Sequence, residues 1–184
     1  MIARRTMRRL RLKTVWLAVF PFLWMSSPDT VSLLLGAGLA LPGLWIRGWS
    51  AGTIHKDKKV AMTGPYALTR NPLYLGSFCI GLGVALAGGQ WFWSLAFLAF
   101  YIVIYSKTIE SEVRHLTQLF PDVYREYASS VPTFFPKITA WSSRNEMDFG
   151  GFCWSQYHRN KEWEASVGFI SVFMVLCAKV VWAF

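Results

Sequence analysis

Arg70 and Glu112 are the two charged residues whose surroundings best suit chemistry. Arg70 stands in the stretch Thr63–Gly76, which holds two prolines, two glycines and two tyrosines between apolar runs. Its guanidinium stays protonated and offers a fork of donors to a carboxylate or a phosphate. Glu112 could pair with Arg70, hold a cationic group of a ligand, or accept a proton. The two residues therefore predict a charged pocket at the ends of apolar segments.

Glu112 also has a plainer interpretation, which its spacing alone favours. Glu110 and Arg114 stand four residues apart and can form an ion pair on the solvated end of a helix, to which Glu112 would also belong. His115 follows one turn beyond Glu112 on the same face and could be a ligand or a base, although an interfacial histidine usually has neither role. Both interpretations of Glu112 stay open at this point.

Two tyrosines lie in the same stretch as the arginine. Tyr66 and Tyr74 could stack on an adenine ring or meet a sulfonium ion through cation–π attraction. Equally, both could belong to the aromatic belt that membrane proteins place at the interface. Gly64-Pro65 is a dipeptide typical of turns, and Pro72 suits the first turn of a helix because its φ is fixed. The stretch therefore predicts a rigid polar lip on a membrane-embedded pocket.

Other common chemistries lack their usual residue patterns. The sequence contains no HExxH, paired HxxxH or Cys/His cluster, so we expect no metal site. A Walker loop, GxGxxG and GxSxG are also absent, which removes the usual support for P-loop, Rossmann and serine-hydrolase functions. The cysteines show no CxxC spacing, and Cys79 and Cys177 lie in apolar runs, where we expect them to serve packing.

The elements that must position these residues are membrane helices. The chain has 184 residues, of which 54% are hydrophobic, and a mean hydropathy of +0.33. Soluble domains average roughly 45–50% apolar residues. We therefore predict an all-α, polytopic membrane helix bundle with about five transmembrane helices, whose ends are extended by flanking residues. The apolar runs are Thr14–Met25, Val31–Trp45, Leu73–Ala87, Trp91–Tyr105 and Ala165–Phe184.

The charge distribution predicts an orientation rather than a nucleic-acid partner. The net charge is +9, and six basic residues crowd the N-terminus directly before the first apolar run. Under the positive-inside rule this places the N-terminus in the cytoplasm, together with the connections 55–71 and 107–164. A cleaved signal peptide is disfavoured because Pro28-Asp29 follows with no small-residue cleavage site. We expect an integral protein of the inner or plasma membrane that contacts the lipid bilayer and no nucleic acid.

Two connections constrain the bundle further. Gly88-Gly89-Gln90 is so short that the third and fourth spans must form an antiparallel hairpin. The fourth helix is expected to continue from Tyr105 to Phe120, because apolar residues recur there at helical spacing. Pro121 should then stop or reset the helix, and residues 131–136 form an extended hydrophobic segment that could cover a pocket. Residues 140–164 suggest no role.

The blocks around Arg70 and Glu112 together resemble the isoprenylcysteine carboxyl methyltransferase and phospholipid methyltransferase superfamily of integral membrane enzymes. The first block, Gly64-Pro65-Tyr66 with Arg70-Asn71-Pro72-Leu73-Tyr74-Leu75-Gly76, is similar to GPYxxxRHPxYxG. The second is similar to EExxLxxxFGxxYxxYxxxVPxFxP. Its matching residues are Glu112, Leu116, Phe120, Tyr124, Tyr127, Val131, Pro132, Phe134 and Pro136. Asn71, Val113 and Pro121 depart from the family's histidine, second glutamate and glycine.

The resemblance implies methyl transfer from S-adenosylmethionine to a lipophilic, membrane-embedded acceptor. It implies one integral membrane domain over residues 1–184, with a methyltransferase-like core at 47–137 and a cytosolic cofactor pocket. Residues 138–184 would add a polar connector and a C-terminal transmembrane helix. Arg70 and Glu112 would be the catalytic residues. The implied cofactor-binding residues are Gly64, Pro65, Tyr66, Arg70, Asn71, Tyr74, Glu112, Val131 and Pro132.

Two other functions remain possible from the sequence. A membrane sterol or steroid reductase that uses NADPH carries a similar RHPNY-type motif. A non-catalytic lipid-binding membrane subunit could retain the pocket, because the family histidine and second glutamate are missing here. The methyl acceptor could be a carboxylate, an amine or a hydroxyl, since acceptor choice depends on apolar helix faces that have no motif.

Overall fold

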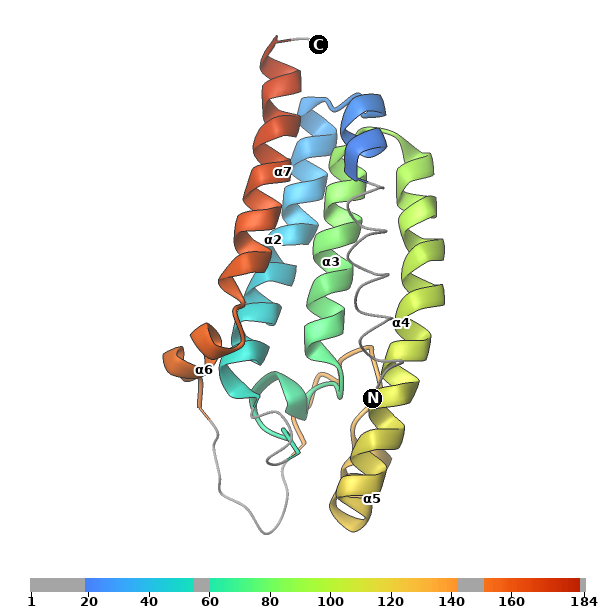
Figure 1. The fold of residues 1–184 in the computed structure, drawn as a ribbon, viewed down its shortest axis with the longest axis vertical. Helices are drawn as coiled ribbons and strands as arrows, with labels where there is room; N and C mark the ends of the chain where they lie inside the picture. The colour runs from blue at the N-terminus through green and yellow to red at the C-terminus, as the bar shows by residue number, and fades with distance from the viewer. Residues whose placement is uncertain (1–18, 55–59, 142–150, 183–184) are drawn as a thin grey trace.

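The computed structural model describes residues 19–54, 60–141 and 151–182, and this part of the chain is helical without any strand (Figure 1). Residues 19–25 are also helical and continue the first apolar run, whose residues 14–18 lie outside the described part. The predicted all-α class is confirmed. The elements are α2 (Thr30–Thr53), η1 (Gly64–Ala67), α3 (Pro72–Ala87), α4 (Trp91–Leu119), α5 (Pro121–Ser130), α6 (Trp154–Arg159) and α7 (Trp163–Trp182).

Three of the described helices are long and apolar enough to cross a membrane. They are α2 with 24 residues, α4 with 29 and α7 with 20. Helix α3 is equally apolar but has 16 residues, fewer than the roughly 20 needed to cross the hydrocarbon core unaided. The structure is therefore a helical membrane bundle, and the number of five spans stays a prediction.

Helices α2 and α3 pack together through glycines. A Cβ atom on Gly36 would lie 2.4 Å from the Gly83 carbonyl oxygen, and one on Gly43 would lie 2.8 Å from that of Gly76. Only glycine allows the two backbones to approach so closely, as is common between membrane helices. This contact fixes α3, and with it the motif residues at its first turns, against α2.

The connection between α3 and α4 is the predicted tight hairpin. Gly89 has a φ of +79°, a left-handed conformation that glycine adopts without strain. Figure 1 shows α3 and α4 side by side and antiparallel, with the turn at one end and η1, α5 and α6 at the other. The predicted continuation of α4 and the restart at Pro121, the first residue of α5, are also confirmed.

Helix α2 is longer than its hydropathy suggests. The apolar run ends at Trp45, but the helix continues to Thr53 and so carries Arg47 in its last turns. A charged side chain at this depth of a membrane helix is costly unless it is paired. Arg47 has such a partner from a distant segment, so the helix continues past the charge.

Candidate functional site

Two segments distant in sequence are joined by backbone hydrogen bonds at the η1 end of the bundle. The Arg70 amide donates to the Pro132 carbonyl at 2.9 Å, and the Lys137 amide donates to the Leu68 carbonyl at 2.9 Å. The Trp141 amide donates to the Ala67 carbonyl at 3.0 Å. The segment 131–141 therefore lies along the stretch 67–70, and the two motif blocks form one unit.

Gly64 and Pro65 shape the turn that leads into this unit. Gly64 has a φ of +59°, which favours glycine, and Pro65 occupies the start of η1, where its fixed φ suits a helical turn. The Tyr127 hydroxyl donates to the Tyr66 carbonyl at 2.7 Å. The turn and this bond together direct the Tyr66 ring into the protein, where it is 5% exposed.

Asn71 and the segment around Val131 hold the unit together. The Asn71 side-chain amide donates to the Thr133 carbonyl at 2.8 Å, and Asn71 is buried. Val131 is 2% exposed and packs in a cluster with Tyr124 and Tyr127. The Pro132 carbonyl already accepts from Arg70. Asn71, Val131 and Pro132, three of the predicted cofactor-binding residues, thus make contacts within the protein that set the shape of the site.

Arg70 carries a charge that no acidic side chain compensates. Its Nη2 donates to the Thr133 hydroxyl, and its Nη1 donates to the Tyr124 hydroxyl at 3.3 Å. The guanidinium carbon also lies 6.0 Å from the centre of the Tyr124 ring. The buried Nε has no hydrogen-bond partner, and no carboxylate pairs with Arg70 anywhere in the described residues. This arginine is therefore suited to bind an anion.

Glu112 turns inward and contacts α3 instead of Arg70. The Tyr74 hydroxyl donates to Glu112 Oε2 at 2.9 Å. The Tyr101 hydroxyl donates to the Tyr74 carbonyl at 2.7 Å, which fixes the start of α3 against α4. Glu110 forms the expected exposed ion pair with Arg114. The solvated pair therefore exists, but Glu112, half-buried beside Tyr74, is not part of it.

The Tyr66 hydroxyl is the least satisfied polar group of this region. It is buried and has no hydrogen-bond partner. Burial raises the pKa of the Tyr66 phenol well above its ordinary value, and the carboxylate of Glu112 raises it further, with a smaller effect from Glu162. A buried hydroxyl without a partner costs about 1–3 kcal/mol. The Tyr66 hydroxyl is therefore an available hydrogen-bonding group in this region.

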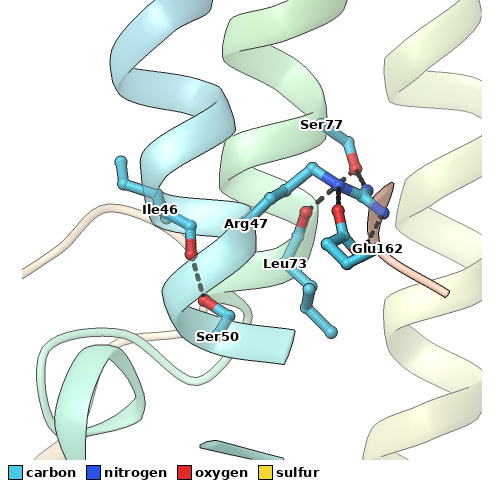
Figure 2. A network of polar contacts seen from close by, with 6 residues as sticks. All are labelled: Ile46, Arg47, Ser50, Leu73, Ser77 and Glu162. Carbon is cyan, nitrogen blue, oxygen red and sulfur yellow. Dashed lines mark hydrogen bonds and ion pairs between the residues drawn. The ribbon is translucent and has the colours of Figure 1, made fainter. Parts of the chain in front are cut away.

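A second charged cluster, which sequence reasoning missed, lies beside this site (Figure 2). Arg47 on α2 donates from Nε and Nη2 to both carboxylate oxygens of Glu162, which precedes α7, and from Nη1 to the Ser77 hydroxyl on α3. Ser77 in turn donates to the Leu73 carbonyl at 2.9 Å. The arginine crosses α3 over Gly76, where a Cβ atom would lie 2.6 Å from Arg47 Cγ.

The segment that leads to Glu162 also caps α2. The Gln156 side chain donates to the Ile54 carbonyl at 2.7 Å, and Asn160 donates to the Ala51 carbonyl at 2.7 Å. The Cys153 amide donates to the Gly52 carbonyl at 3.0 Å. These bonds satisfy carbonyl groups that the end of a helix leaves open. The described part of residues 140–164 thus has a structural role that the sequence did not suggest.

The region that contains Arg70 and Glu112 lies in the part of the chain that matches a known protein family. Residues 31–123, half of the chain, match the phospholipid methyltransferase family, and this region contains Arg70, Tyr74 and Glu112. The chain belongs to the phospholipid methyltransferase family. Residues Val131, Pro132 and Glu162 lie beyond the region that the family matches, although the structure brings them to the same end of the bundle.

Three relatives show how far the similarity extends. The chain is 32% identical over 125 residues to the nickel-cobalt-cadmium resistance protein NccN of Alcaligenes xylosoxydans xylosoxydans, covering 66% of this chain and 56% of the relative. It is 34% identical over 123 residues to the cobalt-zinc-cadmium resistance protein CzcN of Cupriavidus metallidurans, covering 64% of this chain and 54% of the relative. It is 32% identical over 84 residues to the protein-S-isoprenylcysteine O-methyltransferase of Schizosaccharomyces pombe, covering 46% and 36%.

The chain thus spans about half the length, or less, of the relatives that it matches. No solved structure matches it. Two of these relatives carry names of metal resistance. Within residues 19–54, 60–141 and 151–182, no group of three or more His, Cys, Asp or Glu side chains is arranged to hold a metal ion.

Proposed function

We propose that this member of the phospholipid methyltransferase family transfers a methyl group from S-adenosylmethionine to a lipophilic acceptor in the membrane. The observation that carries the proposal is the buried Tyr66 hydroxyl, which lacks a partner beside the Tyr74–Glu112 pair. Arg70, whose charge is uncompensated, belongs to the same loop. The buried hydroxyl lies near the carboxylate of Glu112, and the same loop carries an uncompensated cation, so the region fits a zwitterionic ligand.

The residues match the groups that this cofactor presents. Glu112 and the rings of Tyr66 and Tyr74 suit a positive charge or ribose-type hydroxyls, and Arg70 suits a carboxylate. When bound, S-adenosylmethionine supplies a methyl group on a positively charged sulfur atom. Methyl transfer from such a sulfur is an in-line displacement, so the protein contributes chiefly alignment and exclusion of water.

The role of the two charged residues depends on the acceptor. A hydroxyl acceptor, or an amine that still carries a proton, loses that proton as it is methylated, and we propose that Glu112 accepts it. A carboxylate acceptor needs no base, and Arg70 would then orient it. All three acceptor classes remain open. The family name and the isoprenylcysteine relative both favour a lipophilic acceptor.

We also propose that the pocket faces the cytoplasm. The basic N-terminal residues and the basic connection before Arg70 support a cytoplasmic position for both, in the inner or plasma membrane. Under this orientation the acceptor enters between helices from the inner leaflet, close to the Tyr74–Glu112 pair.

The test is turnover by the purified chain in lipid nanodiscs, with methyl-labelled S-adenosylmethionine and the lipid extract of the host membrane. We expect label in the lipid fraction, and we expect Glu112→Gln to remove most of it. The matched control is Glu110→Gln, which changes a carboxylate of the same helix that faces solvent. Label transfer that survives Glu112→Gln would place the reaction elsewhere. Binding of NADPH without binding of S-adenosylmethionine would contradict the proposal and favour a reductase.

A further inference from the structure

An open aromatic groove lies between α2 and α6, away from the Tyr74–Glu112 pair. Figure 1 shows α6 beside the end of α2, while α3 separates α2 from α4, which carries Glu112. The groove has a volume of about 420 Å³. Its lining residues are Trp45, Gly48, Trp49, Phe152, Trp154 and Tyr157.

The rings that line the groove stand at steep angles to one another. Phe152 and Trp154 meet at 89° with their centres 4.8 Å apart, and Trp154 and Tyr157 meet at 73° and 5.6 Å. On the facing helix, Trp45 and Trp49 are tilted by 44° at 5.1 Å. These rings pack on one another within each segment, and rings of several orientations from both segments border the hollow between them. Aromatic ring faces attract quaternary ammonium groups.

The groove is held in shape by the contacts that cap α2. The Cys153 amide bonds to the Gly52 carbonyl, and the Phe152 ring covers Gly52 so closely that a Cβ atom there would lie 2.3 Å from it. Gly48 lies against the Tyr157 ring, since a Cβ atom there would be in ordinary contact with Tyr157 Cε2 at 3.6 Å. An ordinary interfacial aromatic belt consists of separate rings that face lipid. Here two segments about a hundred residues apart converge on one hollow, which indicates a preformed site.

The lining selects against most ligands. It contains no acidic or basic side chain, so neither a primary ammonium nor a phosphate finds a charged partner inside it. A quaternary ammonium is bulky and cannot donate hydrogen bonds, so it loses less than a primary ammonium by leaving water for ring faces. Basic residues follow directly on α6: the His158 ring lies 6.4 Å from Trp154 and 5.6 Å from Tyr157, and Arg159 comes next.

We propose that this groove binds the quaternary ammonium of a phosphocholine lipid headgroup, with its phosphate directed to His158 and Arg159. The cation meets the ring faces, and the phosphate meets the basic side chains in the last turn of α6. The site is separate from the methyl-transfer pocket and does not depend on its chemistry. The position at the end of a membrane helix, beside interfacial tryptophans, is the depth at which lipid headgroups lie.

The test compares two short-chain lipids that differ in one atom. Dihexanoyl phosphocholine is titrated into the purified full chain in a maltoside detergent, beside an analogue in which a tert-butyl carbon replaces the ammonium nitrogen, so that the headgroup keeps its phosphate and loses its cation. We expect saturable binding of the phosphocholine, about tenfold tighter than that of the analogue. Equal affinity would show only an apolar groove, and no saturable binding of either would show a lipid-facing aromatic surface; both results overturn the proposal.

Substitutions then locate the site. Trp154→Leu is expected to weaken phosphocholine binding about tenfold. Trp91 is a similarly exposed tryptophan at the start of α4, and Trp91→Leu should not change the binding. Unfolding temperatures of both variants control for folding. Arg159→Gln should weaken binding of phosphocholine and leave binding of free choline unchanged. If Trp154→Leu folds and binds as the wild type does, the groove is not the site; if Arg159→Gln has no effect, the phosphate is placed wrongly.

Discussion

Arg47 and Arg70 lie near the same end of the bundle, and both are partly buried, but their partners differ in kind. Arg47 gives two donors to one carboxylate, Glu162, and a third to Ser77. Arg70 contacts two neutral hydroxyl groups, those of Tyr124 and Thr133, and leaves Nε without a partner. The first charge is neutralised within the protein, and the second is not.

This difference separates a structural arginine from a binding one. A charge that is paired and hydrogen-bonded on every side has no electrostatic need for a ligand, and its loss leaves the partner charge buried. A charge held by hydroxyl groups alone is positioned but not neutralised, so an anionic ligand gains from meeting it. We therefore expect changes at Arg47 to alter stability and changes at Arg70 to alter binding.

The largest effect on stability should come from breaking the Arg47–Glu162 pair. Glu162→Ala leaves a guanidinium without its counter-ion, and we expect a loss of up to about 3–5 kcal/mol in the free energy of unfolding. Chemical unfolding in detergent measures it, with the exposed Glu164→Ala as control. The double change Arg47→Met with Glu162→Leu should recover much of the loss. If Glu162→Ala unfolds like the wild type, the pair is not structural.

Tyr66→Phe should raise the free energy of unfolding, the opposite of the effect of Glu162→Ala. The substitution removes a buried hydroxyl that has no partner, so we expect the ligand-free protein to gain up to about 1–3 kcal/mol, while its affinity for S-adenosylmethionine falls. Tyr127→Phe is the matched control, because the Tyr127 hydroxyl donates to the Tyr66 carbonyl, and its loss should destabilise by about 0.5–1.5 kcal/mol. A destabilised Tyr66→Phe variant would mean that the Tyr66 hydroxyl is already satisfied.

The smallest effect is expected at the exposed pair on α4. Arg114→Gln breaks a pair whose side chains are 62% and 65% exposed, so we expect a change of about 0.3–0.5 kcal/mol or less in the free energy of unfolding. Turnover should stay at the wild-type level. A loss of turnover with unchanged stability would show that the end of α4 takes part in the reaction. The expectation that only its inward-facing residues contribute to the site would then be wrong.

The sequence predicted those parts of the molecule that depend on local patterns. Apolar runs located the long helices, and Gly88-Gly89-Gln90 required the hairpin that the structure contains. The motif spacing around Arg70 and Glu112 indicated the family. Each of these signals lies within a few turns of chain, where composition and periodicity reflect the structure directly.

The parts that were missed depend on contacts between distant residues. The apolar run stops at Trp45 because Arg47 interrupts the hydropathy, and the full length of α2 could not be read from it, since the partner Glu162 lies 115 residues away. The Tyr74–Glu112 bond likewise depends on how α3 and α4 are rotated, which the spacing of residues does not specify. An arginine that continues an apolar helix was the available signal, because such a charge requires a partner somewhere in the fold.

The most direct test of the account is the affinity of the purified protein for S-adenosylmethionine, measured by equilibrium binding for the wild type, Arg70→Gln and Arg114→Gln. We predict saturable binding by the wild type, a loss of at least about tenfold in Arg70→Gln with an unchanged free energy of unfolding, and no change in Arg114→Gln. A wild-type protein that does not bind S-adenosylmethionine, or an Arg70→Gln variant that binds it equally well, would contradict the account.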